Sequence, residues 1–74
     1  MTHTGKVTRV WSKPTRGFAL LVPSQPGPPP EPETEYIFIG VDSDDWALAC
    51  LAFSLKCDAT VTGTAPACAG VSLP

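Results

Sequence analysis

One stretch of this chain, from Trp46 to Lys56, constrains the fold more than any other. It is rich in alanine and leucine, which favour a helix over a strand. The preceding residues 42–45, Asp-Ser-Asp-Asp, supply N-cap candidates and place carboxylates where a helix dipole favours negative charge. Lys56 suits the opposite end of such a helix. We therefore expect one helix over about residues 43–56.

Apolar side chains surround this expected helix more completely than a surface helix of a small domain requires. At helical spacing they form two neighbouring faces, Trp46, Cys50 and Phe53 on one and Leu48, Leu51 and Leu55 on the other. Because covering a sheet needs only one stripe, the leucine face is the candidate interface of a homo-oligomer. The alternative is a buried central strand, since periodicity alone does not separate the two, but the alanines favour the helix.

The rest of the chain is typical of β-strands. Its apolar segments are rich in β-branched and aromatic residues, and prolines, which cannot donate a backbone hydrogen bond, interrupt them. The expected strands cover residues 5–12, 16–22, 36–41 and 59–63, and a short last strand is expected at 71–73. No internal repeat is visible in this order of elements.

Residues 23–35 separate the second expected strand from the third. This segment holds six prolines together with acidic residues, so it cannot pack a core and is expected to form an exposed, extended loop. Its Pro-x-x-Pro spacings, at Pro23 with Pro26 and at Pro29 with Pro32, are also compatible with a polyproline II ligand for an aromatic groove. The flanks carry no Arg or Lys anchor, so a solvated connector is the favoured interpretation.

The 74 residues allow one domain, residues 1–74, with a core so small that a partner or a second subunit is expected to add stability. No run of about 18 uncharged apolar residues is present, so we expect no membrane span. The chain does not start with a basic segment followed by an apolar stretch of secretory length. No signal peptide is therefore expected, and the predicted location is cytoplasmic.

Charge is unevenly distributed along the sequence. Four of the five Lys and Arg residues lie in the first 22 residues, which contain no acid, and these are Lys6, Arg9, Lys13 and Arg16. The remaining residues carry one lysine and all seven acids. Such asymmetry can steer an anionic ligand to one edge of a molecule. The alternative is that each charged block is simply a solvated surface.

The expected order of three strands, a helix and a closing pair resembles the oligonucleotide/oligosaccharide-binding (OB) barrel, in which the helix plugs one end between strands three and four. The first forty residues resemble the cold-shock branch of this fold. Residues 5–12 resemble its first strand, Arg-Gly-Phe-Ala-Leu-Leu at 16–21 its first RNA-binding motif, and Tyr-Ile-Phe-Ile at 36–39 its second. This resemblance implies a binder of single-stranded nucleic acid.

Three aromatic positions of the cold-shock pattern hold other residues in this chain. Leu20 stands where the family has a phenylalanine, Arg9 where it has a tryptophan, and Gly40 where it has a histidine. Stacking contributes about 1 to 3 kcal/mol per base, so the loss of these rings predicts weak binding of single strands. We therefore treat nucleic acid as the second of two functional hypotheses.

The second half of the chain resembles the B subunit of pentameric bacterial toxins, another branch of the OB fold. The similar passage runs from Asp45 to Gly63, where a helix of alanine, leucine and small residues is followed directly by a Val/Thr strand. In a toxin ring such helices line a central pore, so this resemblance implies self-assembly through the helix. It also implies a glycan as a ligand class.

The sequence offers no set of residues for catalysis, and we expect no enzyme, no cofactor and no metal site. His3 stands alone near a terminus that is expected to fray. The acids at 42–45 are explained by helix capping and have no further ligand spaced to complete a metal shell. Cys50, Cys57 and Cys68 match neither a metal pair nor an even disulfide framework, so buried free thiols are expected. A bridge between Cys57 and Cys68 is the alternative for an exported chain.

The sequence therefore predicts a mainly β fold with one helix, arranged as a small five-stranded OB-like barrel with the helix between strands three and four. The first functional hypothesis is a non-enzymatic binding or self-assembly module that forms a homo-oligomer through its helix. The candidate ligand-binding residues are Arg9, Trp11, Arg16 and Phe18, because strands one and two carry the usual binding face of this fold.

Overall fold

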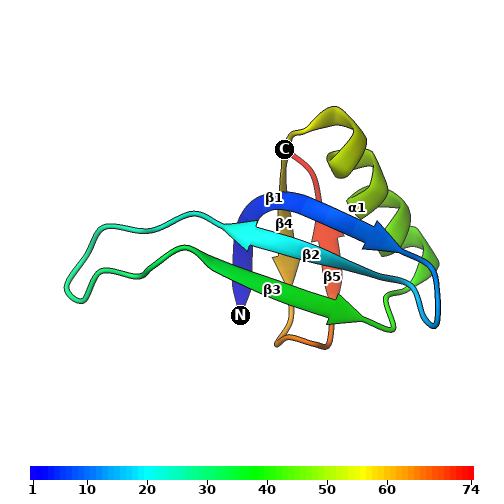
Figure 1. Ribbon diagram of the computed structural model, residues 1–74, viewed down its shortest axis with the longest axis horizontal. Coiled ribbons are helices and arrows are strands. Elements are labelled where there is room, and N and C mark those ends of the chain that lie inside the picture. The colour runs from blue at the N-terminus through cyan, green and yellow to red at the C-terminus, as the bar shows by residue number, and fades with distance from the viewer.

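The computed structural model describes all residues from Met1 to Pro74 and contains five strands and one helix (Figure 1). The elements are β1 (Thr2–Trp11), β2 (Gly17–Val22), β3 (Thr34–Ile39), α1 (Ser43–Leu55), β4 (Asp58–Thr62) and β5 (Gly70–Ser72). The predicted mainly β fold, with one helix between the third and fourth strands, is confirmed.

The five strands form one antiparallel sheet in the order β3-β2-β1-β4-β5. The sheet is not closed, because β3 and β5 do not pair as strands. The end of β3 is nevertheless linked to the loop before β5: the amide of Ile39 donates to the carbonyl oxygen of Pro66 at 3.0 Å, beside an isolated parallel bridge from Ile39 to Ala67. The closed barrel expected from the sequence is therefore not reached.

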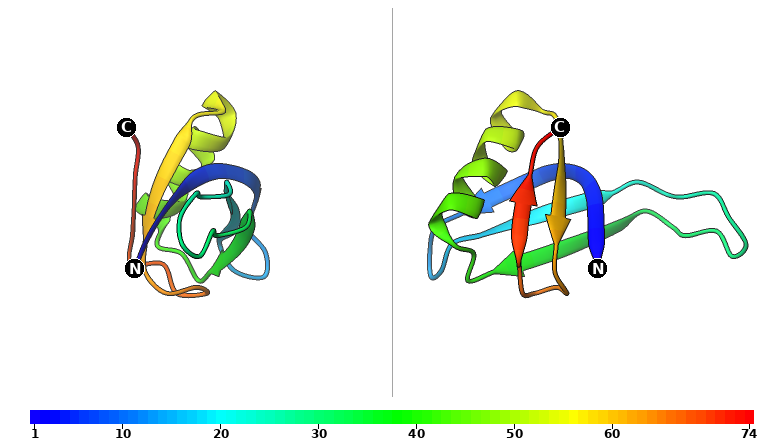
Figure 2. Two further views of the ribbon diagram at one scale, coloured as in Figure 1. Left: turned by 90° about the vertical axis from the view of Figure 1, so that its left-hand side faces the viewer. Right: turned by 180° about the vertical axis from the view of Figure 1, so that it is seen from behind.

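Strand β1 belongs to both halves of this sheet. Its first half, Thr2 to Lys6, pairs with β4, and its second half, Lys6 to Trp11, pairs with β2. Figure 2 shows how β1 bends between these two pairings. At the bend the backbone of Gly5 passes so close to β2 that an added Cβ atom would collide with the carbonyl oxygen of Leu21. This position therefore requires a residue without a side chain.

The core lies between the inner face of the sheet and α1. Phe18, Leu20, Phe38 and Val61 are its largest fully buried side chains, and the rings of Phe18 and Phe38 stack with their centroids 5.2 Å apart. The helix contributes only small residues, Ala49 and Ala52, to the fully buried set. Small side chains let the helix axis lie close to the sheet, so α1 packs along β1 without displacing the larger side chains of the strands.

Both ends of α1 lie close to where the sequence predicts them. The side chain of Asp42 accepts a hydrogen bond from the amide of Asp44 at 3.3 Å, which caps the helix, and Lys56 ends it with a left-handed φ of 56°. Two further bonds attach the start of the helix to the sheet. Trp46 Nε1 donates to the carbonyl oxygen of Gly17 at 3.1 Å, and Asp45 Oδ1 accepts from the amide of Val71 at 3.3 Å.

The N-terminus differs from its prediction. Strand β1 begins at Thr2, not at Gly5, and His3 is a paired strand residue opposite Val61. The imidazole of His3 stacks on the ring of Tyr36, with ring centroids 4.1 Å apart. The expectation of a frayed terminus was wrong, because pairing with β4 and this ring contact hold the first residues in place.

Gly5 provides the sharpest test of the shared β1 strand. We expect Gly5→Ala to lower the free energy of unfolding by at least about 2 kcal/mol, because the new methyl group meets a backbone carbonyl that cannot move aside. Gly70→Ala is the matched control, since no atom lies within 4 Å of an added Cβ there. Its effect is expected to stay below about 1 kcal/mol. Urea denaturation of both variants measures the difference, and equal effects would contradict the close approach.

Candidate ligand face on β1 to β3

The outer face of β1, β2 and β3 carries the polar and aromatic residues of the candidate site. The register between β1 and β2 shifts between Val7 and Arg9, so Thr8 is the extra residue of a β-bulge. A bulge interrupts the alternation of a strand and re-aims the side chains beside it. Both Thr8 and Arg9 are exposed as a result, while Val7 remains in the core.

Trp11 lies at the end of β1, with its indole against Gly17 of β2. Its register partner Gly17 has no side chain, and a Cβ atom added there would lie only 2.5 Å from Trp11 Nε1. The absence of a side chain at Gly17 therefore leaves the space that the indole of Trp11 occupies. The guanidinium carbon of Arg9 lies 5.8 Å from the centroid of the Trp11 ring, within the range of a cation–π contact. Trp11 is half-buried, so part of its surface stays open to a ligand.

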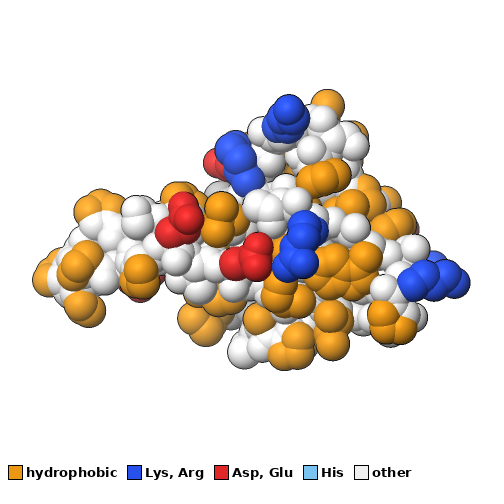
Figure 3. All heavy atoms as spheres, viewed as in Figure 1, with side chains coloured by type: hydrophobic (Ala, Val, Ile, Leu, Met, Phe, Trp, Pro, Cys, Tyr) orange, Lys and Arg blue, Asp and Glu red, His pale blue; other side chains and the backbone are white.

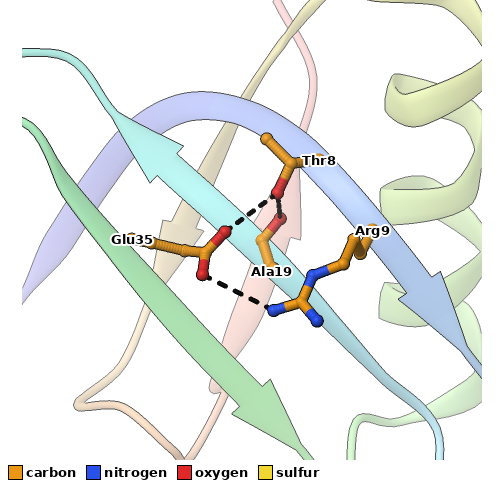
Figure 4. A network of polar contacts seen from close by, with 4 residues as sticks. All are labelled: Thr8, Arg9, Ala19 and Glu35. Atoms are coloured by element: carbon orange, nitrogen blue, oxygen red, sulfur yellow. Dashed lines mark hydrogen bonds and ion pairs between the residues drawn. The ribbon is translucent and has the colours of Figure 1, made fainter.

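Arg9 is held from its other side by β3 (Figure 4). Its Nη2 lies 3.5 Å from Glu35 Oε1, and the hydroxyl of Thr8 donates to Glu35 Oε2 at 3.3 Å. The same hydroxyl lies 3.5 Å from the carbonyl oxygen of Ala19. Exposed ion pairs of this kind contribute about 0.2 to 1 kcal/mol. The pair with Glu35 therefore positions Arg9, but it is weak enough for a ligand anion that binds the guanidinium more tightly to replace Glu35.

The register of β2 with β3 extends this surface with apolar side chains. Ile39 is in line with Gly17 and Trp11, and Ile37 is in line with Ala19 and Arg9. The two isoleucines are 48% and 36% exposed, respectively. Together with the bulge and the indole they form one outer patch, which we call the Trp11 face: Thr8, Arg9, Trp11, Glu35, Ile37 and Ile39.

The loop between β1 and β2 adds positive charge at one end of this face. Lys13 and Arg16 line an open hollow together with the hydroxyl residues Ser12 and Thr15. Figure 3 shows Lys and Arg side chains over β1 and at this end of the molecule, with acidic side chains nearer the opposite end. The asymmetry along the sequence is not a clean asymmetry in space, because Asp42, Asp44 and Asp45 at the start of α1 lie next to this loop: the amide of Val41 donates to the carbonyl oxygen of Arg16 at 3.0 Å.

The structure brings together two of the four predicted ligand-binding residues. Arg9 and Trp11 are neighbours on the Trp11 face, and Arg16 lies in the adjacent loop. Phe18 does not belong to the site, because it lies on the inner face of β2 with no exposed surface and stacks on Phe38. That prediction was wrong: the alternation of β2 directs Phe18 to the core.

Sequence reasoning also missed contributors to the site. Glu35 lies within the predicted loop of residues 23–35, whereas β3 already begins at Thr34. The sequence pattern could have predicted the isoleucines, because alternation in Tyr-Ile-Phe-Ile places Ile37 and Ile39 on the other face of the strand from the buried Phe38. No sequence signal marked the bulge at Thr8, because bulges arise from the pairing of two strands.

A second surface of interest is the outer side of α1. Leu51 and Leu55, one helical turn apart, are 45% and 64% exposed, and we call these two residues the α1 patch. Phe53, which is 42% exposed, lies on the opposite flank of the helix, where it lines a hollow with Lys6, Val7 and Thr8. Leu48 is half-buried and packs against the core. Of the three leucines predicted as an interface, Leu51 and Leu55 thus face solvent, whereas Leu48 mainly supports the core.

The cysteines are unpaired and only half-buried. Burial raises the pKa of the Cys50 thiol. Burial also raises the pKa of the Cys68 thiol, the negative charge of Asp45 raises it further, and a backbone hydrogen bond with Gly70 lowers it in part. Both thiols are therefore weaker nucleophiles at neutral pH than an ordinary cysteine.

No group of three or more His, Cys, Asp or Glu side chains is arranged to hold a metal ion. The single helix lacks the combination of length and apolar character that crossing a bilayer requires. No known protein family, curated protein or solved structure matches the chain.

The raised pKa of Cys68 has a measurable consequence. At pH 8 we expect its alkylation by iodoacetamide to be slower in the folded chain than in the urea-unfolded chain, because less of the folded thiol is ionised. The two rates should converge only as the pH rises above the folded pKa, which is higher than 9.0. The stabilisation from the protonated thiol is present below the ordinary pKa of 9.0 and is lost as pH rises through the folded value. Peptide mass spectrometry measures the rates, and equal rates at pH 8 would contradict the assignment.

Proposed function

We propose that this protein is a non-enzymatic binding module of the OB type that forms a homo-oligomer through α1. The strand order, the helix between β3 and β4, and the bridge from the end of β3 to the loop before β5 support this fold. OB barrels are commonly only partly closed, so an open edge between β3 and β5 is compatible with it. A cytoplasmic location stays a prediction from the sequence.

The exposed α1 patch is the observation on which the oligomer rests. Two large apolar side chains, Leu51 and Leu55, are exposed one turn apart on a helix that has no charged residue between Trp46 and Leu55. Burying these leucines therefore removes apolar surface from water without desolvating any helix charge. A second copy is the occupant we favour, because two identical helices can pair the same patch across a two-fold axis. With only 13 buried residues, the domain would also gain stability from such a contact.

Leu51 is the position that tests self-association most directly. We expect Leu51→Asp to convert the oligomer to a monomer, because the carboxylate would be desolvated in the contact. The isolated fold should be retained, since Leu51 is 45% exposed and an aspartate there stays solvated. Light scattering coupled to size-exclusion chromatography measures the mass, and circular dichroism measures the fold.

Thr64→Asp is the matched control for this experiment. Thr64 is an exposed residue of the loop between β4 and β5, so the substitution adds the same charge away from α1. It should leave the mass unchanged. A wild-type chain that is monomeric at all concentrations, or a Leu51→Asp variant with the wild-type mass and fold, would overturn the α1 oligomer.

Binding of single-stranded nucleic acid is the second candidate function, and the Trp11 face favours it. The half-buried indole offers a stacking surface for a base, and Arg9, Lys13 and Arg16 lie at the same end of the molecule for phosphates. Ring stacking also suits a glycan, which is the uncharged alternative. Salt dependence distinguishes the two, because only the nucleic acid releases counterions on binding.

Arg9 tests the nucleic-acid hypothesis separately from the oligomer. We expect Arg9→Ala to weaken binding of a fluorescein-labelled oligonucleotide and to reduce the slope of log affinity against log salt by about 1. The oligomer mass should not change, because Arg9 lies on β1, away from the α1 patch. Fluorescence anisotropy at several salt concentrations measures the slope. Affinity that does not respond to salt, or is unaltered in the variant, would count against this candidate.

A further inference from the structure

The proline-rich segment between β2 and β3 forms an ordered projection from the domain. Every residue from Pro23 to Glu33 is exposed, and we call this segment the proline arm. Its two sides are paired at Gln25 and Glu31, whose backbones exchange hydrogen bonds of 2.9 and 3.0 Å. Figure 1 shows the proline arm continuing the line of β2 and β3 well beyond the sheet. The expected loop is thus an extended hairpin.

The proline arm and the Trp11 face are complementary in chemistry. Proline-rich segments dock on surfaces lined by aromatic side chains, because their backbone is already extended and loses little entropy on binding. The Trp11 face offers a half-buried indole beside the exposed Ile39. Docking of the prolines would cover both of these apolar groups.

Charge is complementary as well. The proline arm carries Glu31 and Glu33 and no cation, so it lacks the basic anchor with which many proline-rich ligands meet an acidic groove. The Trp11 face and its neighbouring loop provide three cations, Arg9, Lys13 and Arg16, of which Arg9 is already paired with Glu35. The basic anchors are therefore on the docking surface and the acids are on the ligand, which favours this chain as its own partner.

The arm of a molecule cannot reach the basic end of its own Trp11 face. The domain measures 38 Å along its longest axis, with the proline arm at one end and the loop between β1 and β2 at the other (Figures 1 and 3). The backbone pairing of Gln25 with Glu31 holds the arm in the direction that leads away from the sheet. Contact between the two surfaces therefore requires two molecules.

We infer that the proline arm of one molecule docks on the Trp11 face of a second copy, with its prolines against Trp11 and Ile39 and its glutamates against the cations. The contact is head-to-tail, because it joins two different surfaces, and it repeats from one copy to the next. It uses neither Leu51 nor Leu55, so it is independent of the proposed α1 contact. The same docking would also cover the surface available to a nucleic acid.

A synthetic peptide tests this contact in isolation. A fluorescein-labelled peptide of residues 23–33 is titrated with the Leu51→Asp variant, in which the α1 contact is removed. We expect saturable binding with a dissociation constant below about 1 mM, and weaker binding as salt increases. A peptide with Glu31→Gln and Glu33→Gln should bind at least about tenfold more weakly, a loss of about 1.4 kcal/mol. Because these changes are in the peptide, they do not depend on folding of a protein variant.

Two protein variants locate the site of docking. Arg9→Ala and Trp11→Ala should each weaken binding of the peptide, whereas Thr64→Asp should leave its dissociation constant unchanged. An unlabelled peptide should also displace a labelled oligonucleotide if that oligonucleotide binds the Trp11 face. Absence of saturable binding up to about 1 mM, or equal binding of the charge-neutral peptide, would overturn the inference. Binding that is unaffected by both Arg9→Ala and Trp11→Ala would overturn it too, whatever the result for the α1 oligomer.

Discussion

The shared strand β1 is the constraint on which the remaining structure depends. Because its two halves pair with different partners, one continuous strand joins the β2–β3 hairpin to the β4–β5 pair. The bend is compatible only with a residue as small as Gly5, whose backbone lies against the carbonyl oxygen of Leu21. The curvature that results places the inner side chains of both halves around one core. It also leaves the outer side of β1 to β3 uncovered, which is where the Trp11 face lies.

The helix illustrates how a small core determines which surfaces remain available. Close packing on β1 uses Ala49 and Ala52, so the large apolar residues of α1 are displaced to its flanks and its outer side. In a larger domain a second layer would cover Leu51 and Leu55. In residues 1–74 the segment after β4 forms β5 at the edge of the sheet and does not cover these leucines. The exposed Leu51 and Leu55 therefore remain uncovered in the single domain.

Most of the fold was predictable from local patterns, whereas the site was predictable only in part. Strand and helix order follow from composition and proline positions, and the cap at Asp42 was visible in the sequence. The start of β1 at Thr2 was not, because it depends on pairing with a strand more than fifty residues away. Phe18 was misplaced for a related reason. An aromatic residue on a strand faces either the core or a ligand, and only the register with Phe38 distinguishes the two.

The two proposed contacts between copies have different symmetries, and this difference determines what they can build together. Pairing of identical α1 patches is isologous and closes with two molecules. Docking of the proline arm on the Trp11 face is heterologous, so it forms a ring if the rotation closes and a filament if it does not. The surfaces do not overlap, since the α1 patch lies on the helix and the Trp11 face on β1 and β3. A ring formed by the arms could therefore still pair with a second ring through α1. Mass measurements at high salt separate the contributions, because salt weakens the charged arm contact far more than the uncharged helix contact.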